Sequence, residues 1–157
     1  MKKIKNPFVG HQGFNCFGCS PDNSIGLKME FIDEGDYFIC NWEPKERFQG
    51  YNHILHGGIQ ATLMDEIASW YILAKLGTAG VTSQMETRHK KPIYTNKGKL
   101  KIKAWLKEQS SRIVKINVEI YNNDNSLGAT GIIEYFILSP EQAKEKLMYP
   151  GKNAFYY

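Results

Sequence analysis

A His-Gly-Gly triplet, His56-Gly57-Gly58, opens the one long helical stretch that the sequence predicts, and Asp65 follows inside it. The first N–H groups of a helix have no partners within the helix and lie at its positive end. Glycine has no side chain that would keep a ligand away from them. The triplet therefore predicts an oxyanion hole, the set of donors that acyl-transfer chemistry requires. Alternatively, the two glycines only let the helix pack closely against a sheet.

Asp65 and Glu66 both lie in an apolar run, where a carboxylate is costly unless it is paired or functional. One of them is expected to face solvent or to make a structural hydrogen bond, and periodicity does not separate the two. A functional acid here could activate water as a general base, or could attack a carbonyl carbon directly. Thr82, on the next predicted strand, could hydrogen-bond to either species or be an ordinary β-branched strand residue.

The spacing of Gly57 and Asp65 predicts how the chain assembles. Eight residues along a helix correspond to roughly 12 Å at 1.5 Å per residue, too far for both residues to act easily on one carbonyl. If both serve one substrate, Asp65 must meet Gly57 of a second copy. The sequence thus predicts a homodimer, or a dimer of dimers (a homotetramer), with its sites at the subunit interface.

Hydrophobic periodicity predicts the elements that position these residues. The helix is apolar nearly all round and ends at Gly77 and Gly80, so it is a buried helix. Alternating patterns predict a hairpin before it and four strands after it, over residues 26–43, 81–93, 99–104, 114–121 and 128–138. Only an antiparallel sheet wrapped around one long central helix would cover such a helix, which is an α+β architecture.

The overall composition predicts one domain over residues 1–157, with an N-terminal loop segment over 1–24 and a short C-terminal helix and tail over 139–157. The net charge of +4 is too small to indicate nucleic acid, but it favours an anionic small ligand. No apolar stretch approaches the roughly 20 residues that span a bilayer, and no apolar region follows the basic start. We therefore expect a cytoplasmic protein without a membrane partner.

Cys16 and Cys19, with His11 upstream, could begin a zinc site. A structural zinc site usually has four ligands, and the chain has no second Cys-x-x-Cys pair. Residues elsewhere could complete the site only by chance of folding, namely Cys40, His53 or His89. A redox role lacks the βαβ context that usually surrounds such a pair. The sequence therefore predicts no metal and no cofactor.

Further short motifs accompany the triplet, namely Cys16-Phe17-Gly18-Cys19, Asn23-Ser24-Ile25-Gly26-Leu27, Phe48-Gln49-Gly50-Tyr51, Ala61-Thr62-Leu63-Met64-Asp65, and Val81-Thr82 with Pro92 ten residues later. With the order of elements, they resemble the hotdog fold, and more closely the PaaI-like acyl-coenzyme A thioesterases, over residues 14–138. The resemblance implies hydrolysis of an acyl-coenzyme A to acid and coenzyme A. It gives Gly57 the role of carbonyl-polarising donor and Asp65 that of base or nucleophile. Thr82 then positions the water or the acid, and His56 orients the loop.

Substrate-binding residues are predicted around this centre. Gly58 belongs to the open helix start, and Arg88, Lys90 and Lys91 could hold the phosphates of coenzyme A, although a charged strand edge would look the same. Relatives often carry Asn where this chain has Gly50, so Asn52 is included as a substrate-binding candidate. Trp70 and Tyr71 are bulky enough to shorten an acyl pocket. They favour a small, medium-chain or aromatic acyl group.

Two rival functions remain open at this point. Dehydratase and hydratase relatives carry a His five residues after the Asp, and this chain has Trp70 there. A non-catalytic acyl-coenzyme A-binding protein would present the same binding residues. Asp65 favours catalysis, because a pure binder has no use for a buried carboxylate beside an anionic ligand.

Overall fold

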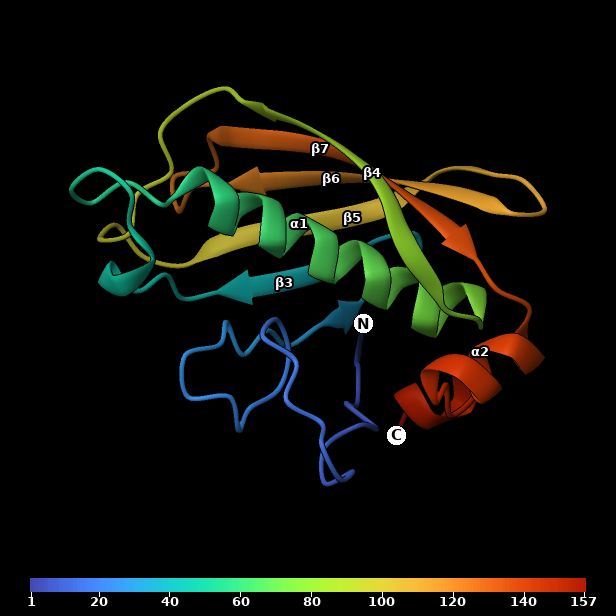
Figure 1. Cartoon of the computed structure of the whole chain (residues 1–157). Helices are drawn as coiled ribbons and strands as arrows, with labels where there is room; N and C mark the ends of the chain where they lie inside the picture. Colours follow the sequence, from blue (N-terminus) through green and yellow to red (C-terminus); the bar gives the residue numbers. More distant parts are fainter.

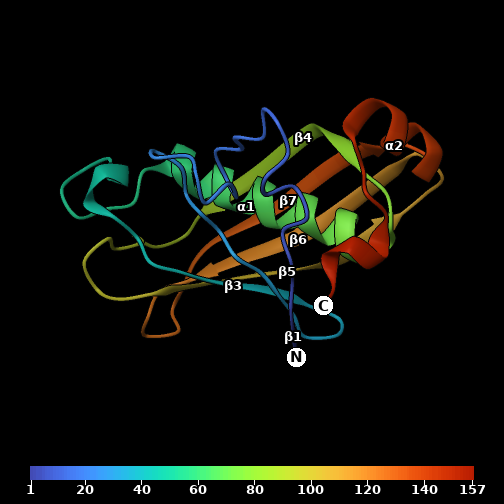
Figure 2. The same ribbon diagram turned by 90° about the horizontal axis from the view of Figure 1, so that it is seen from below.

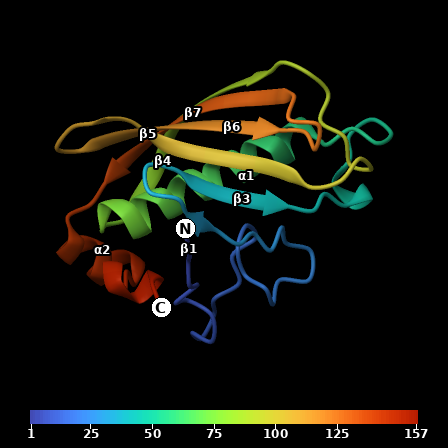
Figure 3. The ribbon, with the colours of Figure 1, turned by 180° about the vertical axis from the view of Figure 1, so that it is seen from behind.

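One antiparallel sheet curves around a long helix in the computed structural model, which describes residues 1–157 (Figure 1). The helix α1 spans Gly57–Tyr71, and the strand order is β1-β2-β3-β5-β6-β7-β4. The strands are β1 (Lys2–Lys3), β2 (Ile32–Asp33), β3 (Phe38–Trp42), β4 (Gly80–His89), β5 (Leu100–Gln109), β6 (Ile113–Tyr121) and β7 (Leu127–Ile137). Seen from the opposite side, β5 and β6 cover α1 (Figure 3). The predicted wrapped helix and the four strands after it are confirmed.

The helix begins and ends where the sequence predicts. His56 caps it, because its Nδ1 accepts a hydrogen bond of 2.9 Å from the Gly58 N–H. After Tyr71 the helix widens into one π turn, Ile72–Leu76, and stops at Gly77, which has a φ of 74°. The apolar side chains in its middle have no exposed surface, namely Leu63, Met64, Ile67 and Ala68. Packing against the sheet therefore holds α1 in place.

The predicted hairpin over residues 26–43 is only partly correct. Burial alternates as expected, with Leu27, Met29 and Phe31 buried, but the paired strand β2 contains only two residues. The Leu27 and Met29 N–H groups instead donate to the carbonyl oxygens of Phe17 and Gly18, at 2.8 and 2.9 Å. The alternating burial thus belongs to a segment that packs on the core but hydrogen-bonds to the N-terminal loop and lies outside the sheet. The turn at 33–36 is confirmed by a 2.9 Å bond from the Glu34 N–H to the Tyr37 carbonyl.

Strand β4 has two features that bear on the site. It is the last strand of the sheet and pairs only with β7, so its other edge is open. Its register shifts between Thr82 and Gln84, which leaves Ser83 as an extra residue without a partner on β7. Eight of its ten residues are exposed. This strand is therefore an uncovered edge running beside α1.

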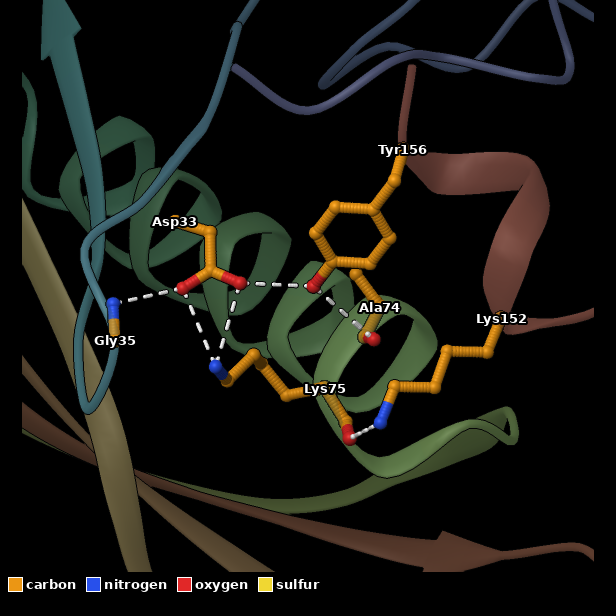
Figure 4. Close-up of polar contacts among 6 residues, drawn as sticks. All are labelled: Asp33, Gly35, Ala74, Lys75, Lys152 and Tyr156. Atoms are coloured by element: carbon orange, nitrogen blue, oxygen red, sulfur yellow. Dashed lines mark hydrogen bonds and ion pairs between the residues drawn. The ribbon is translucent and has the colours of Figure 1, made fainter. Parts of the chain in front are cut away.

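Both chain ends pack at the C-terminal end of α1 (Figure 2). The short helix α2 (Pro140–Leu147) starts with the predicted Ser139 cap and Pro140, and a 3-10 turn, η3 (Lys152–Phe155), follows. The buried Asp33 carboxylate joins these parts (Figure 4). It accepts hydrogen bonds from the Gly35 N–H at 2.9 Å and the Tyr156 hydroxyl at 2.8 Å, and it pairs with Lys75 Nζ at 3.2 Å. No helix in the chain has the length and apolar character needed to cross a membrane.

Candidate active site

The Asp65 carboxylate is held by two hydroxyl groups from the neighbouring strands. Thr82 Oγ1 on β4 donates to Asp65 Oδ1 at 2.9 Å, and the Tyr135 hydroxyl on β7 lies 2.7 Å from the same oxygen. Tyr135 is only 1% exposed, whereas Asp65 is partly open to solvent. The second oxygen, Oδ2, has no partner within the chain. Asp65 is thus fixed through one oxygen and keeps the other free to accept a proton or to attack.

The helix start presents an unused donor. The Gly58 N–H is bonded to His56 Nδ1, whereas the Gly57 N–H has no partner within the chain and Gly57 is exposed. His56 thereby ties its imidazole to the first turn of α1, and its Nδ1 must be unprotonated to accept the bond. The arrangement leaves the Gly57 N–H directed outward at the positive end of α1. It fits the donor of an oxyanion hole.

A second polar pair, Gln60 and His89, lies beside this donor. Gln60 is 4% exposed, and its amide Nε2 donates to the Leu55 carbonyl at 3.0 Å. Its Oε1 must therefore accept from His89 Nδ1, 2.8 Å away, so the proton of a neutral His89 sits on Nδ1. The other side of the imidazole faces Gly57, since a Cβ placed there would lie 3.7 Å from His89 Cε1.

An open pocket of about 610 Å³ surrounds Gly57. Its wall includes His56, Gln60, His89, Lys90 and Lys91. Lys90 and Lys91 therefore lie beside the helix start, and their contact with phosphates stays a prediction. The wall of the pocket includes an outward N–H, an imidazole and two lysine residues, which suits an anionic ligand with a carbonyl group.

Other predicted residues are not brought together with these. Asn52 is exposed on the loop before the helix and does not line the pocket. Arg88 also lies outside it, with its guanidinium 3.5 Å from Glu86. Trp70 and Tyr71 are core residues. Trp70 stacks on Phe31 at 5.0 Å between ring centroids, and Tyr71 meets Phe38 edge-on at 5.4 Å. Their bulk does not limit the space beside Gly57.

Glu66 points away from Asp65, toward the N-terminal loop. Its Oε1 accepts from the Trp70 indole N–H at 3.1 Å and lies 3.4 Å from Cys16 Sγ. Burial, with a smaller effect of Cys16, raises the pKa of the Glu66 carboxyl to about 7. The Cys19 thiol, by hydrogen bonding, lowers the pKa of Cys16 to about 5 despite burial. Of the two adjacent acids, only Asp65 faces the strands that carry Thr82 and Tyr135.

Some of these residues were not predicted from the sequence. Tyr135 contacts Asp65 across 70 positions, and nothing near it in the sequence marks the contact. Gln60 carried one signal, because a polar side chain on a helix that is apolar all round needs a partner. His89 belongs to the basic cluster, but its pairing with Gln60 depends on the sheet register. These contacts are long-range and become visible only in the folded chain.

The family follows from comparison with known proteins. The thioesterase superfamily model matches residues 52–129, which include the helix start, Asp65 and Thr82. The chain belongs to this superfamily and has its hotdog fold, as the sequence resemblance indicated. No curated protein is similar enough to count as a match.

Solved structures with the same fold include three with low sequence identity. Zebrafish thioesterase superfamily member 2 is 23% identical, with a TM-score of 0.66, over 76% of this chain and 88% of that one. A hypothetical thioesterase with coenzyme A from Streptococcus pneumoniae is 22% identical, with a TM-score of 0.64, over 71% and 86%. The PaaI protein of the E. coli phenylacetic acid degradation operon is 18% identical, with a TM-score of 0.64, over 72% and 81%.

Proposed function

We propose that the protein is an acyl-coenzyme A thioesterase that hydrolyses an acyl-coenzyme A to the free acid and coenzyme A. The observation that carries the proposal is the Asp65 carboxylate, held through Oδ1 by Thr82 and Tyr135 with Oδ2 free. A positioned acid of this kind can act as base or nucleophile. In a protein that only bound an anionic ligand, it would weaken binding.

In the proposed reaction, Gly57 and Asp65 act together on the thioester carbonyl. The Gly57 N–H donates to the thioester carbonyl oxygen and stabilises the negative charge that develops there. Asp65 removes a proton from water as the water oxygen attacks the carbonyl carbon, or attacks that carbon itself. The tetrahedral intermediate then expels the thiolate of coenzyme A, which takes up a proton. In the second route, water hydrolyses the mixed anhydride and regenerates Asp65.

Each site lies between two copies of the chain in this proposal. Gly57 and Asp65 of one copy are about 12 Å apart along α1, so Asp65 of the partner subunit serves the carbonyl held at Gly57. The uncovered edge strand β4 supports such pairing, since its Val81 and Met85 side chains are 50% and 37% exposed. Asp65 lies beside this edge through its bond to Thr82. The homodimer is the smallest assembly that completes the site.

Coenzyme A is the proposed carrier because the pocket around Gly57 is lined by Lys90 and Lys91. Ammonium groups bind phosphate oxygens, and coenzyme A carries phosphates. The neighbour from Streptococcus pneumoniae has coenzyme A in its structure, which agrees with this choice.

A panel of acyl-coenzyme A esters, assayed by release of free thiol, tests the proposal. We expect hydrolysis of several esters, and a kcat at least about a hundredfold lower in Asp65→Asn, in the range for loss of a catalytic base. Asp36→Asn, at an exposed turn, is the matched control and should keep full activity. Binding of the esters without thiol release would overturn the proposed thioesterase activity and support a non-catalytic acyl-coenzyme A-binding protein. Full activity in Asp65→Asn would overturn the assignment of the acid.

A further inference from the structure

Three groups that bind metals meet beside α1, on the side that faces the N-terminal segment and away from β4 and β7. They are the thiols of Cys16 and Cys19 and the carboxylate of Glu66, and their ligand atoms all lie within 4.8 Å of one another. The N-terminal segment brings the two cysteines to the helix, along the flank that the sheet leaves open (Figure 2). Neither Cys40, His53 nor His89 belongs to the group. The third group comes from the helix itself, which the spacing of the cysteines could not reveal.

The distances fit a tetrahedral ion. With metal–sulfur and metal–oxygen distances of about 2.3 and 2.0 Å, a sulfur and an oxygen on one tetrahedral zinc lie about 3.5 Å apart. Cys16 Sγ and Glu66 Oε1 are 3.4 Å apart. This pair therefore already has the spacing of two ligands on one ion, and the Cys19 thiol lies within 4.8 Å of both.

The loop is shaped around the carboxylate. A side chain at position 18, between the two cysteines, would collide with the Glu66 carboxyl group. Gly18 is buried, Cys19 is 6% exposed and Cys16 is half-buried. Glycine at this position leaves the space through which Glu66 reaches both thiols.

The group is acidic and has no cation of its own. Glu66 forms no ion pair with any Lys or Arg, and its hydrogen-bond donors are the Trp70 indole and the Cys16 thiol. Two thiolates and a carboxylate would carry three negative charges, which a divalent cation reduces to one. Thiolate ligands select zinc over magnesium or calcium.

One side of the group opens into a pocket of about 400 Å³. The wall is largely apolar and includes Phe8, Phe14 and Leu73. His11 lines the same pocket but is not among the converging groups. A fourth position on the ion would face this space and hold a water molecule.

We propose that Cys16, Cys19 and Glu66 bind one Zn²⁺ ion, with water in the fourth position, and that the ion fastens the N-terminal segment to α1 at the residue after Asp65. This site is separate from the thioesterase centre, because Asp65 points toward β4 and β7 whereas Glu66 points toward the N-terminal segment. The test of the zinc site is therefore independent of the test of the proposed hydrolysis.

Metal analysis of the whole chain tests the site. After reduction, incubation with Zn²⁺ and removal of excess metal, we expect one zinc per chain. Cys16→Ser, Cys19→Ser and Glu66→Gln should each weaken zinc affinity by at least about a hundredfold, since loss of outer-shell partners alone costs 10–100-fold. The matched control is Cys40→Ala, which removes a buried cysteine outside the group and should keep one zinc.

Cobalt substitution and thermal unfolding give readouts besides stoichiometry. Co²⁺ in the site should show thiolate charge-transfer absorption, which falls by about half in either cysteine variant. A chelator should lower the Tm of the wild type and leave that of Cys16→Ser unchanged. Failure of the reduced chain to retain zinc would overturn the proposal, as would an unchanged zinc affinity in Glu66→Gln. Recovery of a metal-free Cys16–Cys19 disulfide that binds no zinc after reduction would overturn it in favour of redox chemistry.

Discussion

The Tyr135 hydroxyl lies 2.7 Å from Oδ1 of Asp65 and 2.7 Å from the backbone carbonyl oxygen of the same residue. One buried hydroxyl on β7 thus contacts both the Asp65 carboxylate and the backbone of the helix that carries it. Burial, reinforced by Asp65, raises the pKa of Tyr135 well above its usual value. Tyr135 therefore keeps its proton at neutral pH and can act as a donor that positions Asp65.

Tyr135→Phe should lower kcat about tenfold and change KM by less than about twofold. The substitution keeps the ring and removes only the hydroxyl. A hydrogen bond to a charged group is worth about 1.5–3 kcal/mol. An increase of about 1.4 kcal/mol in the activation free energy lowers the rate tenfold. Steady-state thiol release measures both constants. Tyr121→Phe is the control, because that hydroxyl donates to Glu119 on β6, away from the site. An unchanged kcat in Tyr135→Phe would exclude a positioning role.

Thr82 and Ser83 offer a comparison between adjacent hydroxyls. Thr82 Oγ1 donates to Asp65, whereas Ser83 Oγ donates to Glu134 at 2.7 Å. We expect Thr82→Ala to lose about tenfold in kcat, and Thr82→Ser to stay near wild type because it keeps the donor. Ser83→Ala should have little effect. Equal losses in Thr82→Ala and Ser83→Ala would point to general disturbance of β4 rather than to contact with Asp65.

The Gly57 N–H can be removed without breaking the helix. Gly57 is the first helical residue, where proline is tolerated, and His56 has the extended φ and ψ of −57° and 134° that a residue before proline adopts. Gly57→Pro should therefore lower kcat by about a hundredfold while α1 stays folded. Gly57→Ala keeps the N–H, and its Cβ would meet His89 only at ordinary contact distance, so it should lose less activity than Gly57→Pro. Circular dichroism checks the helix in both variants.

Mixing two inactive variants tests the shared site. A dimer of one Asp65→Asn chain and one Gly57→Pro chain has one intact Gly57–Asp65 pair across the interface if the site is shared. With random exchange of subunits, half of the dimers are mixed and each has one of two sites, so about a quarter of wild-type activity should return. No recovery, in a mixture whose subunits are shown to exchange, would mean that each chain carries its own complete site.

Lys90→Ala and Lys91→Ala should raise KM for an acyl-coenzyme A several-fold and leave kcat nearly unchanged. Both residues line the pocket beside Gly57, and contacts to phosphates add uniform binding. The difference from wild type should shrink at high salt, because exposed charges are screened. Arg88→Ala is the internal comparison, since Arg88 lies beside Glu86 and outside the pocket. A larger effect in Arg88→Ala than in the lysine variants would place the phosphates elsewhere.

The Asp33 cluster predicts a loss of stability in acid. Burial alone would raise the pKa of Asp33, but the Gly35 N–H, the Tyr156 hydroxyl and Lys75 together hold it below its usual range. A lowered pKa in the folded state stabilises the protein above the unfolded pKa, near 3.9, and this stabilisation is lost as pH falls further. Asp33→Asn should cost about 1.5–3 kcal/mol at pH 7, the range for a hydrogen bond to a charged group, measured by urea unfolding. The difference in free energy of unfolding between wild type and Asp33→Asn should become smaller toward pH 3.

Lys152→Met serves as the control for this cluster. Its exposed ammonium donates only to the Lys75 carbonyl, at 2.9 Å (Figure 4), so the loss should stay below about 1 kcal/mol and show no such pH dependence. A pH-independent difference between wild type and Asp33→Asn would show that the carboxylate charge contributes nothing.

The sequence predicted the elements whose signals are local. The period of 3.6 gave α1, Gly77 its end and Ser139-Pro140 the start of α2, because each depends on neighbouring residues only. The segment from Leu27 to Phe31 was misassigned as a strand, since alternating burial does not say which backbone supplies the partner. Here Phe17 and Gly18 do so, and Lys28 adopts a φ of 53° that no regular strand contains.

The candidate site was predictable where its residues lie close together on the helix. His56, Gly57, Gly58 and Asp65 follow from one motif and the geometry of a helix start. Tyr135 and the pairing of Gln60 with His89 do not, because they depend on which strand lies beside α1 and on its register. The meeting of Glu66 with the two cysteines is of the same kind, spanning 50 positions.

The extra residue in β4 decides which side chains α1 meets. Thr82 and His89 are seven positions apart, and in a regular strand an odd separation puts two side chains on opposite faces. The unpaired Ser83 shifts the alternation by one, so that Thr82 pairs with Tyr135 and His89 with Ala129, both of them inward-facing. Because of this one inserted residue, the Thr82 and His89 side chains lie on the same face of the strand, Thr82 beside Asp65 and His89 beside the start of α1. A chain lacking it could present Thr82 to Asp65 or His89 to Gln60, but not both.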